Sequence, residues 1–155
     1  MVQRIQSLYL LLTTIFSVLF QSGKILKFND DAKNFLYINL GGLNRISETG
    51  GTAQLQRLLP LTGLLLLIPL VSLITIFLFK NRKLQIRFVL GLIILIILLI
   101  LALAYYFYFV VLHYNAEFLP GLSLIFPILM LICACLAYRS IKKDDELVKS
   151  YNRLR

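Results

Sequence analysis

The sequence has few charged residues for its length, and none of them falls within its long apolar runs. Only 15% of the 155 residues are charged, whereas 59% are hydrophobic. An average soluble domain is about half apolar and about a quarter charged. A water-soluble core of this size cannot bury so much apolar surface. The composition therefore excludes an ordinary soluble protein and predicts one whose surface faces lipid.

The absence of charge inside the apolar runs also limits the function. An ionisable side chain at mid-bilayer costs about 2.5–3.5 kcal/mol or more, so it usually marks a transport pathway or a proton relay. The polar residues of the runs are mostly Ser and Thr, whose hydroxyls usually bond to their own helix or to a neighbouring one. A small proton-coupled exporter needs a buried carboxylate, and a transporter therefore stays only an alternative.

Cysteine and histidine, which form most metal and redox sites, are scarce. Cys133 and Cys135 are two residues apart in an apolar run, so on a helix they point to nearly opposite sides and do not readily form a disulfide. Disulfide-exchange enzymes typically use Cys-x-x-Cys instead. The single histidine, His113, lies four residues before Glu117, a pair that is more typical of an interfacial polar contact than of a metal site. We expect no catalytic residue, no metal site and no cofactor, and hence no enzyme.

Four apolar runs are long enough to cross a bilayer. The second and third contain 22 and 25 residues without a charge, and about 20 helical residues span the hydrocarbon core. The first run lacks the A-x-A-like cleavage pattern of a signal peptide, so we expect it to be retained. We predict an all-α membrane protein with one domain, residues 1–155, built as a four-transmembrane-helix bundle. Its expected helices are at about 5–22, 58–79, 88–112 and 118–138.

The distribution of basic residues predicts the orientation. The link 80–87 contains four Lys or Arg residues and the tail 139–155 contains six, whereas the much longer loop 21–57 contains five. Basic residues concentrate on the cytoplasmic side of membrane proteins. Both termini are therefore expected in the cytoplasm, with loop 21–57 outside, in a multi-pass membrane protein. The net charge of +9 then reflects contact with anionic headgroups, and we expect no nucleic-acid partner.

Two segments outside the spans have a pattern of their own. Residues 35–40 are rich in β-formers and precede Gly41-Gly42, and residues 24–28 can pair with them across a turn. We predict a small β-hairpin there, and a loop at 49–52 before the second helix. The tail is expected to extend its helix as an amphipathic segment, which either docks on a partner or the membrane or is simply a solvated flank. Its apolar positions are Leu147, Tyr151 and Leu154.

Aromatic residues are concentrated near the outer end of the third run. Aromatic side chains line some lipid and quinone sites, but belts of aromatic residues at the membrane interface are commoner. Tyr105, Tyr108 and His113 are therefore the candidate contacts for a lipid or a quinone.

The first twelve residues, Met-Val-Gln-Arg-Ile-Gln-Ser-Leu-Tyr-Leu-Leu-Leu, contain a specific motif. This opening resembles an uncharacterised family of bacterial four-helix inner-membrane proteins of unknown function, whose members begin with Gln-Arg-Ile-Gln before a Tyr-Leu-Leu-Leu run. The family provides no functional residues. The resemblance implies that Gln3, Arg4 and Gln6 form a shared cytoplasmic patch, which either anchors the helix or docks a partner.

We therefore expect a non-enzymatic accessory or scaffold subunit of a larger inner-membrane complex, in envelope biogenesis or protein export. Its partners would be membrane lipids and other membrane proteins. The alternatives are a lipid- or quinone-binding membrane protein and a small transporter.

Overall fold

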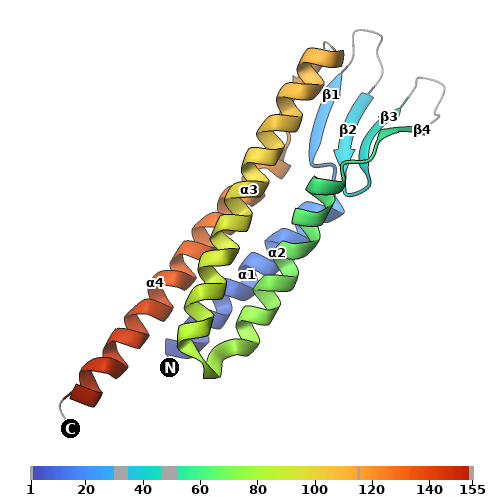
Figure 1. The fold of residues 1–155 in the computed structure, drawn as a ribbon. Helices are drawn as coiled ribbons and strands as arrows, with labels where there is room; N and C mark the ends of the chain where they lie inside the picture. The colour runs from blue at the N-terminus through green and yellow to red at the C-terminus, as the bar shows by residue number, and fades with distance from the viewer. Residues whose placement is uncertain (1, 30–34, 47–51, 115, 154–155) are drawn as a thin grey trace.

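The computed structural model describes residues 2–29, 35–46, 52–114 and 116–153. Within these ranges the chain forms four α-helices and one five-stranded sheet (Figure 1). The four helices are long and apolar enough to cross a membrane. They are α1 (Val2–Ser22), α2 (Leu59–Phe77), α3 (Arg82–Tyr114) and α4 (Ile125–Arg153).

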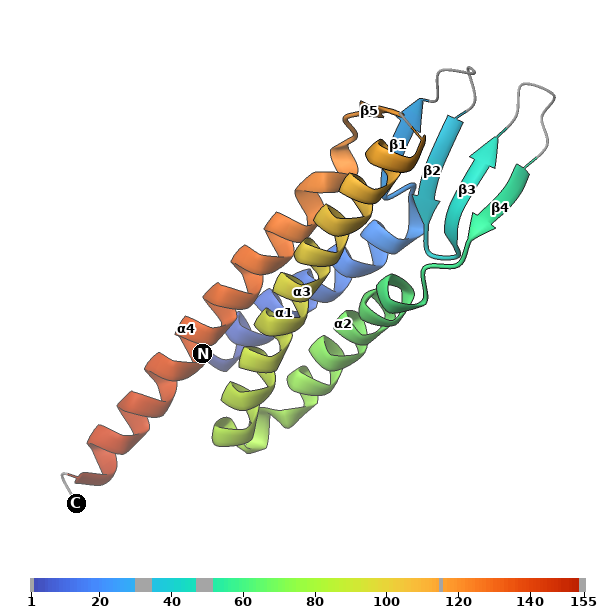
Figure 2. The same cartoon turned by 45° about the horizontal axis from the view of Figure 1, so that its top comes forward.

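The helices pack around a ring in chain order. Each of α1, α2 and α3 contacts the next helix, and α4 returns to pack on α1, which is its most extensive contact. Figures 1 and 2 show the four helices running side by side, with neighbours in opposite directions. This is the arrangement of an up-and-down four-helix bundle, with four of the strands inserted between α1 and α2.

The buried positions of each helix recur at alternating intervals of three and four residues. This period of about 3.5 is the pattern of left-handed bundles, in which side chains of one helix insert between those of the next. Small residues on α4 let it approach α1 closely. The buried seams are Gln6, Leu10, Thr13, Ser17 and Phe20 on α1; Leu61, Leu65, Ile68, Ser72 and Thr75 on α2; Gln85, Val89, Leu92, Ile96, Leu99 and Leu103 on α3; and Met130, Ala134, Ala137, Ile141 and Asp144 on α4.

The expectation of an all-α bundle with one small hairpin is wrong, because a five-stranded antiparallel sheet is part of the fold. The strand order is β4-β3-β2-β1-β5. The pairing predicted between 24–28 and 35–40 is present, as β1 with β2, but three further strands join it. The strands are β1 (Leu26–Asn29), β2 (Phe35–Asn39), β3 (Gly42–Ile46), β4 (Thr52–Gln56) and β5 (Glu117–Leu119).

Two of the missed strands lie where the sequence pattern indicated something else. β4 reads Thr-Ala-Gln-Leu-Gln. Thr52 is its only β-branched residue and none is aromatic, so it lacks the enrichment that indicates a strand. β5 lies within the start of the apolar run 118–138 and pairs with β1, about ninety residues earlier. Consequently α4 begins at Ile125 rather than at 118. It continues past the predicted span to Arg153, as expected of a helical extension into the tail.

One face of the sheet is covered by the end of α3. At about 1.5 Å per residue, its 33 residues reach about 50 Å, well beyond the roughly 30 Å of a hydrocarbon core. Phe107 of α3 packs on Phe28 of β1, with ring centroids 5.8 Å apart, and the inward side chains of β1, β2 and β3 are buried. We call this the sheet end of the molecule, and the opposite end, where α4 terminates, the tail end (Figure 1).

Candidate functional site

A layer of buried polar side chains crosses the bundle at its tail end. Each helix contributes one, and each occupies the seam position of its helix that is nearest this end. We call Gln6, Thr75, Gln85 and Asp144 the polar layer. Their exposed fractions are 5%, 0%, 2% and 7%.

Hydrogen bonds within the polar layer join neighbouring helices. The Gln6 Nε2 amide donates to the Asp144 carboxylate and to the carbonyl oxygen of Ser140, at 3.3 Å, and so connects α1 to α4. The Gln85 Nε2 amide donates to the carbonyl oxygen of Thr75, 3.3 Å away, and connects α3 to α2. The Arg82 guanidinium donates to the main-chain carbonyl of Asp144 at 3.1 Å, which connects α3 to α4.

This arrangement holds the helices in register. A buried polar group costs free energy unless it is hydrogen-bonded, so a slip of one helix against another would leave these groups without partners. Single buried polar residues in an otherwise apolar seam fix the register of helical bundles in the same way. The donors of the polar layer are the amides of Gln6 and Gln85, and the acceptors include the Asp144 carboxylate. These groups form hydrogen bonds between helices, and this is the chemical role that the arrangement supports.

Of the three residues in the predicted docking patch, the structure describes one side chain. Gln6 points into the bundle and bonds to α4 of its own chain. The side chains of Gln3 and Arg4 lie outside the described residues, so docking by them stays a prediction. Asp144 was missed because the tail was treated as lying beyond the last span. Asp144 lies three residues after Ile141 and so continues the spacing of the buried positions of α4. This spacing is the signal in the sequence that indicates burial of Asp144.

The candidate lipid contacts do not gather around a cavity. Tyr105 and Tyr108 are each 64% exposed, and His113 is exposed and stacked on Phe109, with ring centroids 4.2 Å apart. These residues lie on the outer side of α3, where an interfacial aromatic belt is expected. A pocket does exist nearby, but it is lined by other residues.

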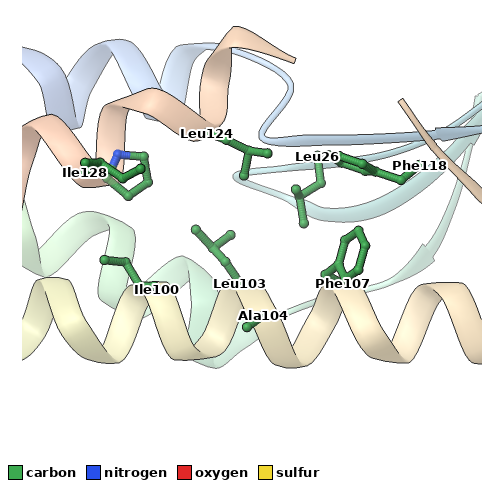
Figure 3. A pocket seen from close by; sticks show the side chains of 9 residues that line it. Leu26, Ile100, Leu103, Ala104, Phe107, Phe118, Leu124 and Ile128 are labelled. Carbon is green, nitrogen blue, oxygen red and sulfur yellow. The ribbon is translucent and has the colours of Figure 1, made fainter. Parts of the chain in front are cut away.

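This pocket lies at the sheet end, between α3 and α4, beneath β1 and β5. It has a volume of about 350 Å³, which is within the range of about 300–1,000 Å³ that is typical of small-molecule sites. Figure 3 shows side chains from both helices and both strands pointing into the same space. We call it the α3–α4 pocket, and its lining is Leu26, Ile100, Leu103, Ala104, Phe107, Phe118, Leu124, Pro127 and Ile128.

Polar side chains in the middle of the helices are used for packing. Ser72 of α2 donates its hydroxyl to the carbonyl oxygen of Leu10 on α1 at 2.9 Å, and Thr14 of α1 donates to the Ser72 hydroxyl at 3.0 Å. The two thiols are free, with Cys133 buried and Cys135 exposed. Their opposite directions are those that a spacing of two on a helix predicts.

The geometry of these sites can be set beside known proteins. No curated protein matches the chain, and no solved structure matches it. A family model described as a domain of unknown function, DUF4293, matches residues 2–154. Because this match covers nearly the whole sequence, the chain belongs to the DUF4293 family, whose function is not established.

Proposed function

We propose that the protein is a non-enzymatic accessory or scaffold subunit of a complex in the bacterial inner membrane, and that its sheet binds an extended segment of a partner protein. The observation that carries the proposal is the free edge of β4. Envelope biogenesis and protein export are the processes to which we assign it, because both place extended chains at the outer side of this membrane.

Strand β4 forms one edge of the sheet. It pairs with β3, and no other strand among the described residues lies on its other side. All five of its side chains are exposed. A bulge at Leu55 interrupts its pairing with β3, so Thr52 to Gln54 form the regular part of the edge.

The composition of β4 favours pairing with another chain. Edge strands are usually protected by Lys, Pro, inward-pointing charges or bulges, and apart from the bulge at Leu55 β4 contains none of these. An unprotected edge offers main-chain N–H and C=O groups to an extended peptide, which binds by adding a strand. This mode of binding needs no catalytic residue, and it suits a protein that holds a partner.

The tail end supports the same proposal. Helix α4 continues past the start of α1 (Figure 1). Lys142 and Lys143, which lie between the two residues of α4 that bond to Gln6, are exposed. With the tail end in the cytoplasm, these lysines would contact the anionic headgroups of that leaflet, while the sheet faces the outer side.

A photocrosslinking residue at Ala53 is expected to form an adduct with one defined membrane or envelope protein in native membranes. The same residue at Lys27 is the control, because Lys27 is exposed on the same sheet but lies in an inner strand. Introducing Thr52→Lys and Gln54→Lys should lower the yield of the Ala53 adduct by about tenfold, since charges block edge pairing. Equal adducts at both positions, or adducts with lipid alone, would argue against this function.

The proposed orientation is tested by thiol labelling in a variant with both native cysteines replaced by alanine. Cysteine at Ala53 should react with a membrane-impermeant reagent added from outside intact cells, and cysteine at Lys83 should react only after the membrane is opened. Ala53 and Lys83 are both exposed, and their elements lie at opposite ends of the molecule. A reagent present on the same side of the membrane as either cysteine can therefore reach it. The opposite labelling pattern would reverse the orientation.

A further inference from the structure

The α3–α4 pocket differs from the surrounding surface of the bundle, because two strands cover it at the sheet end. Leu26 of β1 and Phe118 of β5 close it from that side, whereas Ile128 of α4, 57% exposed, leaves it open laterally. Leu101 and Ile125, exposed on α3 and α4 next to lining residues, are apolar, as a surface facing lipid requires. We propose that the pocket holds one acyl chain of a phospholipid from the leaflet at the sheet end.

The chemistry of the walls favours a hydrocarbon chain over a quinone ring. All nine lining residues are apolar, so no side chain there donates a hydrogen bond to a quinone carbonyl. Burying such a carbonyl without a donor costs free energy. An acyl chain carries no polar group, and its dispersion contacts with the aromatic and aliphatic walls improve with close packing.

The basic residues near β1 lie on the other face of the sheet. Leu26 and Phe28 are buried on the face toward α3, so Lys27, which alternates with them, points to the opposite, exposed face. The Lys24 ammonium lies over the ring of Tyr37, the ladder partner of Lys27, at 4.7 Å from the ring centroid. The proposed contact is therefore with the hydrocarbon chain, whatever the charge of the headgroup.

The proposal differs from the sequence-based expectation in the residues that it uses. Tyr105 and Tyr108 lie about a quarter turn around α3 from Ala104 and Phe107, since successive helical residues are about 100° apart. They flank the pocket and do not line it. The inference is also independent of the proposed partner at β4, which lies at the opposite edge of the sheet.

The test uses purified full-length protein in vesicles of phosphatidylethanolamine and phosphatidylglycerol. A trace of the phosphatidylglycerol carries a diazirine near the end of one acyl chain. After illumination, we expect adducts to concentrate in residues 100–107 and 124–128, as mapped by mass spectrometry. Ala104→Phe should lower the adducts in these segments by about tenfold, because the added ring occupies the pocket. Gly63→Phe is the matched control, since a side chain there meets open space.

The role of the headgroup is tested separately. Because Lys24 and Lys27 lie on the sheet face away from the pocket, Lys24→Gln with Lys27→Gln should leave its labelling by phosphatidylglycerol unchanged. A phosphatidylcholine carrying the same diazirine chain should label the same segments. Thermal unfolding of each variant in detergent confirms that it is folded. Adducts spread evenly along all four helices, or unchanged in folded Ala104→Phe, would overturn the proposal. Stronger pocket labelling by an isoprenoid quinone probe than by phosphatidylglycerol would overturn it as well.

Discussion

Replacing Gly42 with alanine is expected to disrupt the sheet. Gly42 begins β3 with a φ of +129°, a conformation that costs other residues about 1–3 kcal/mol. A Cβ at this position would also lie 2.2 Å from the carbonyl oxygen of Gln56 and 3.0 Å from the Cα of Arg57. Because these are main-chain atoms, no side-chain rotation can relieve the contact. The end of β4 and its connection to α2 would have to move.

The effect of Gly42→Ala can be measured as a fall in the midpoint of thermal unfolding in detergent and as faster proteolysis of residues 23–58. Gly63→Ala is the matched control. Gly63 lies within α2 with no atom near the position of an added Cβ, so alanine there should leave stability unchanged or raise it by about 1 kcal/mol. Equal behaviour of the two variants would show that the turn at Gly42 is not required for the sheet.

The second large effect is expected in the polar layer. Gln6→Ala removes the amide that donates to the Asp144 carboxylate. Asp144 is only 7% exposed, so its carboxylate would remain buried without that donor. Loss of one partner of a buried hydrogen bond costs about 1–3 kcal/mol, and more where the group is charged. We therefore expect Gln6→Ala to destabilise the bundle clearly in chemical or thermal unfolding.

The double substitution Gln6→Leu with Asp144→Leu tests the cause. Replacing both partners with apolar groups of similar size is often nearly neutral, so this variant should recover most of the stability that Gln6→Ala loses. The comparison also separates the two interpretations of the N-terminal motif. If Gln6 instead docks a partner, Gln6→Ala would keep its stability and lose the co-purified partner, which would contradict a structural role.

The four helices that are long and apolar enough to cross a membrane were predictable because their cause is local. A run of apolar residues either is or is not long enough to cross a bilayer, whatever the rest of the chain does. The pairing of β1 with β2 was predictable for a similar reason, since the two strands are close in sequence and β2 is rich in β-formers. Strand β4 carries little such signal, because it has one β-branched residue and no aromatic one. Its pairing with β3 alone makes it a strand.

The sequence by itself therefore determined the spans, the uneven distribution of basic residues and one hairpin. Only the tertiary structure decided that Glu117–Leu119 is a strand, that Asp144 is buried beside Gln6, and that β1 and β5 roof a pocket between α3 and α4. Each of these features joins residues about ninety or more positions apart. Local composition sets what a segment can form, whereas the partner that satisfies its hydrogen bonds or covers its apolar face is set by how the helices pack.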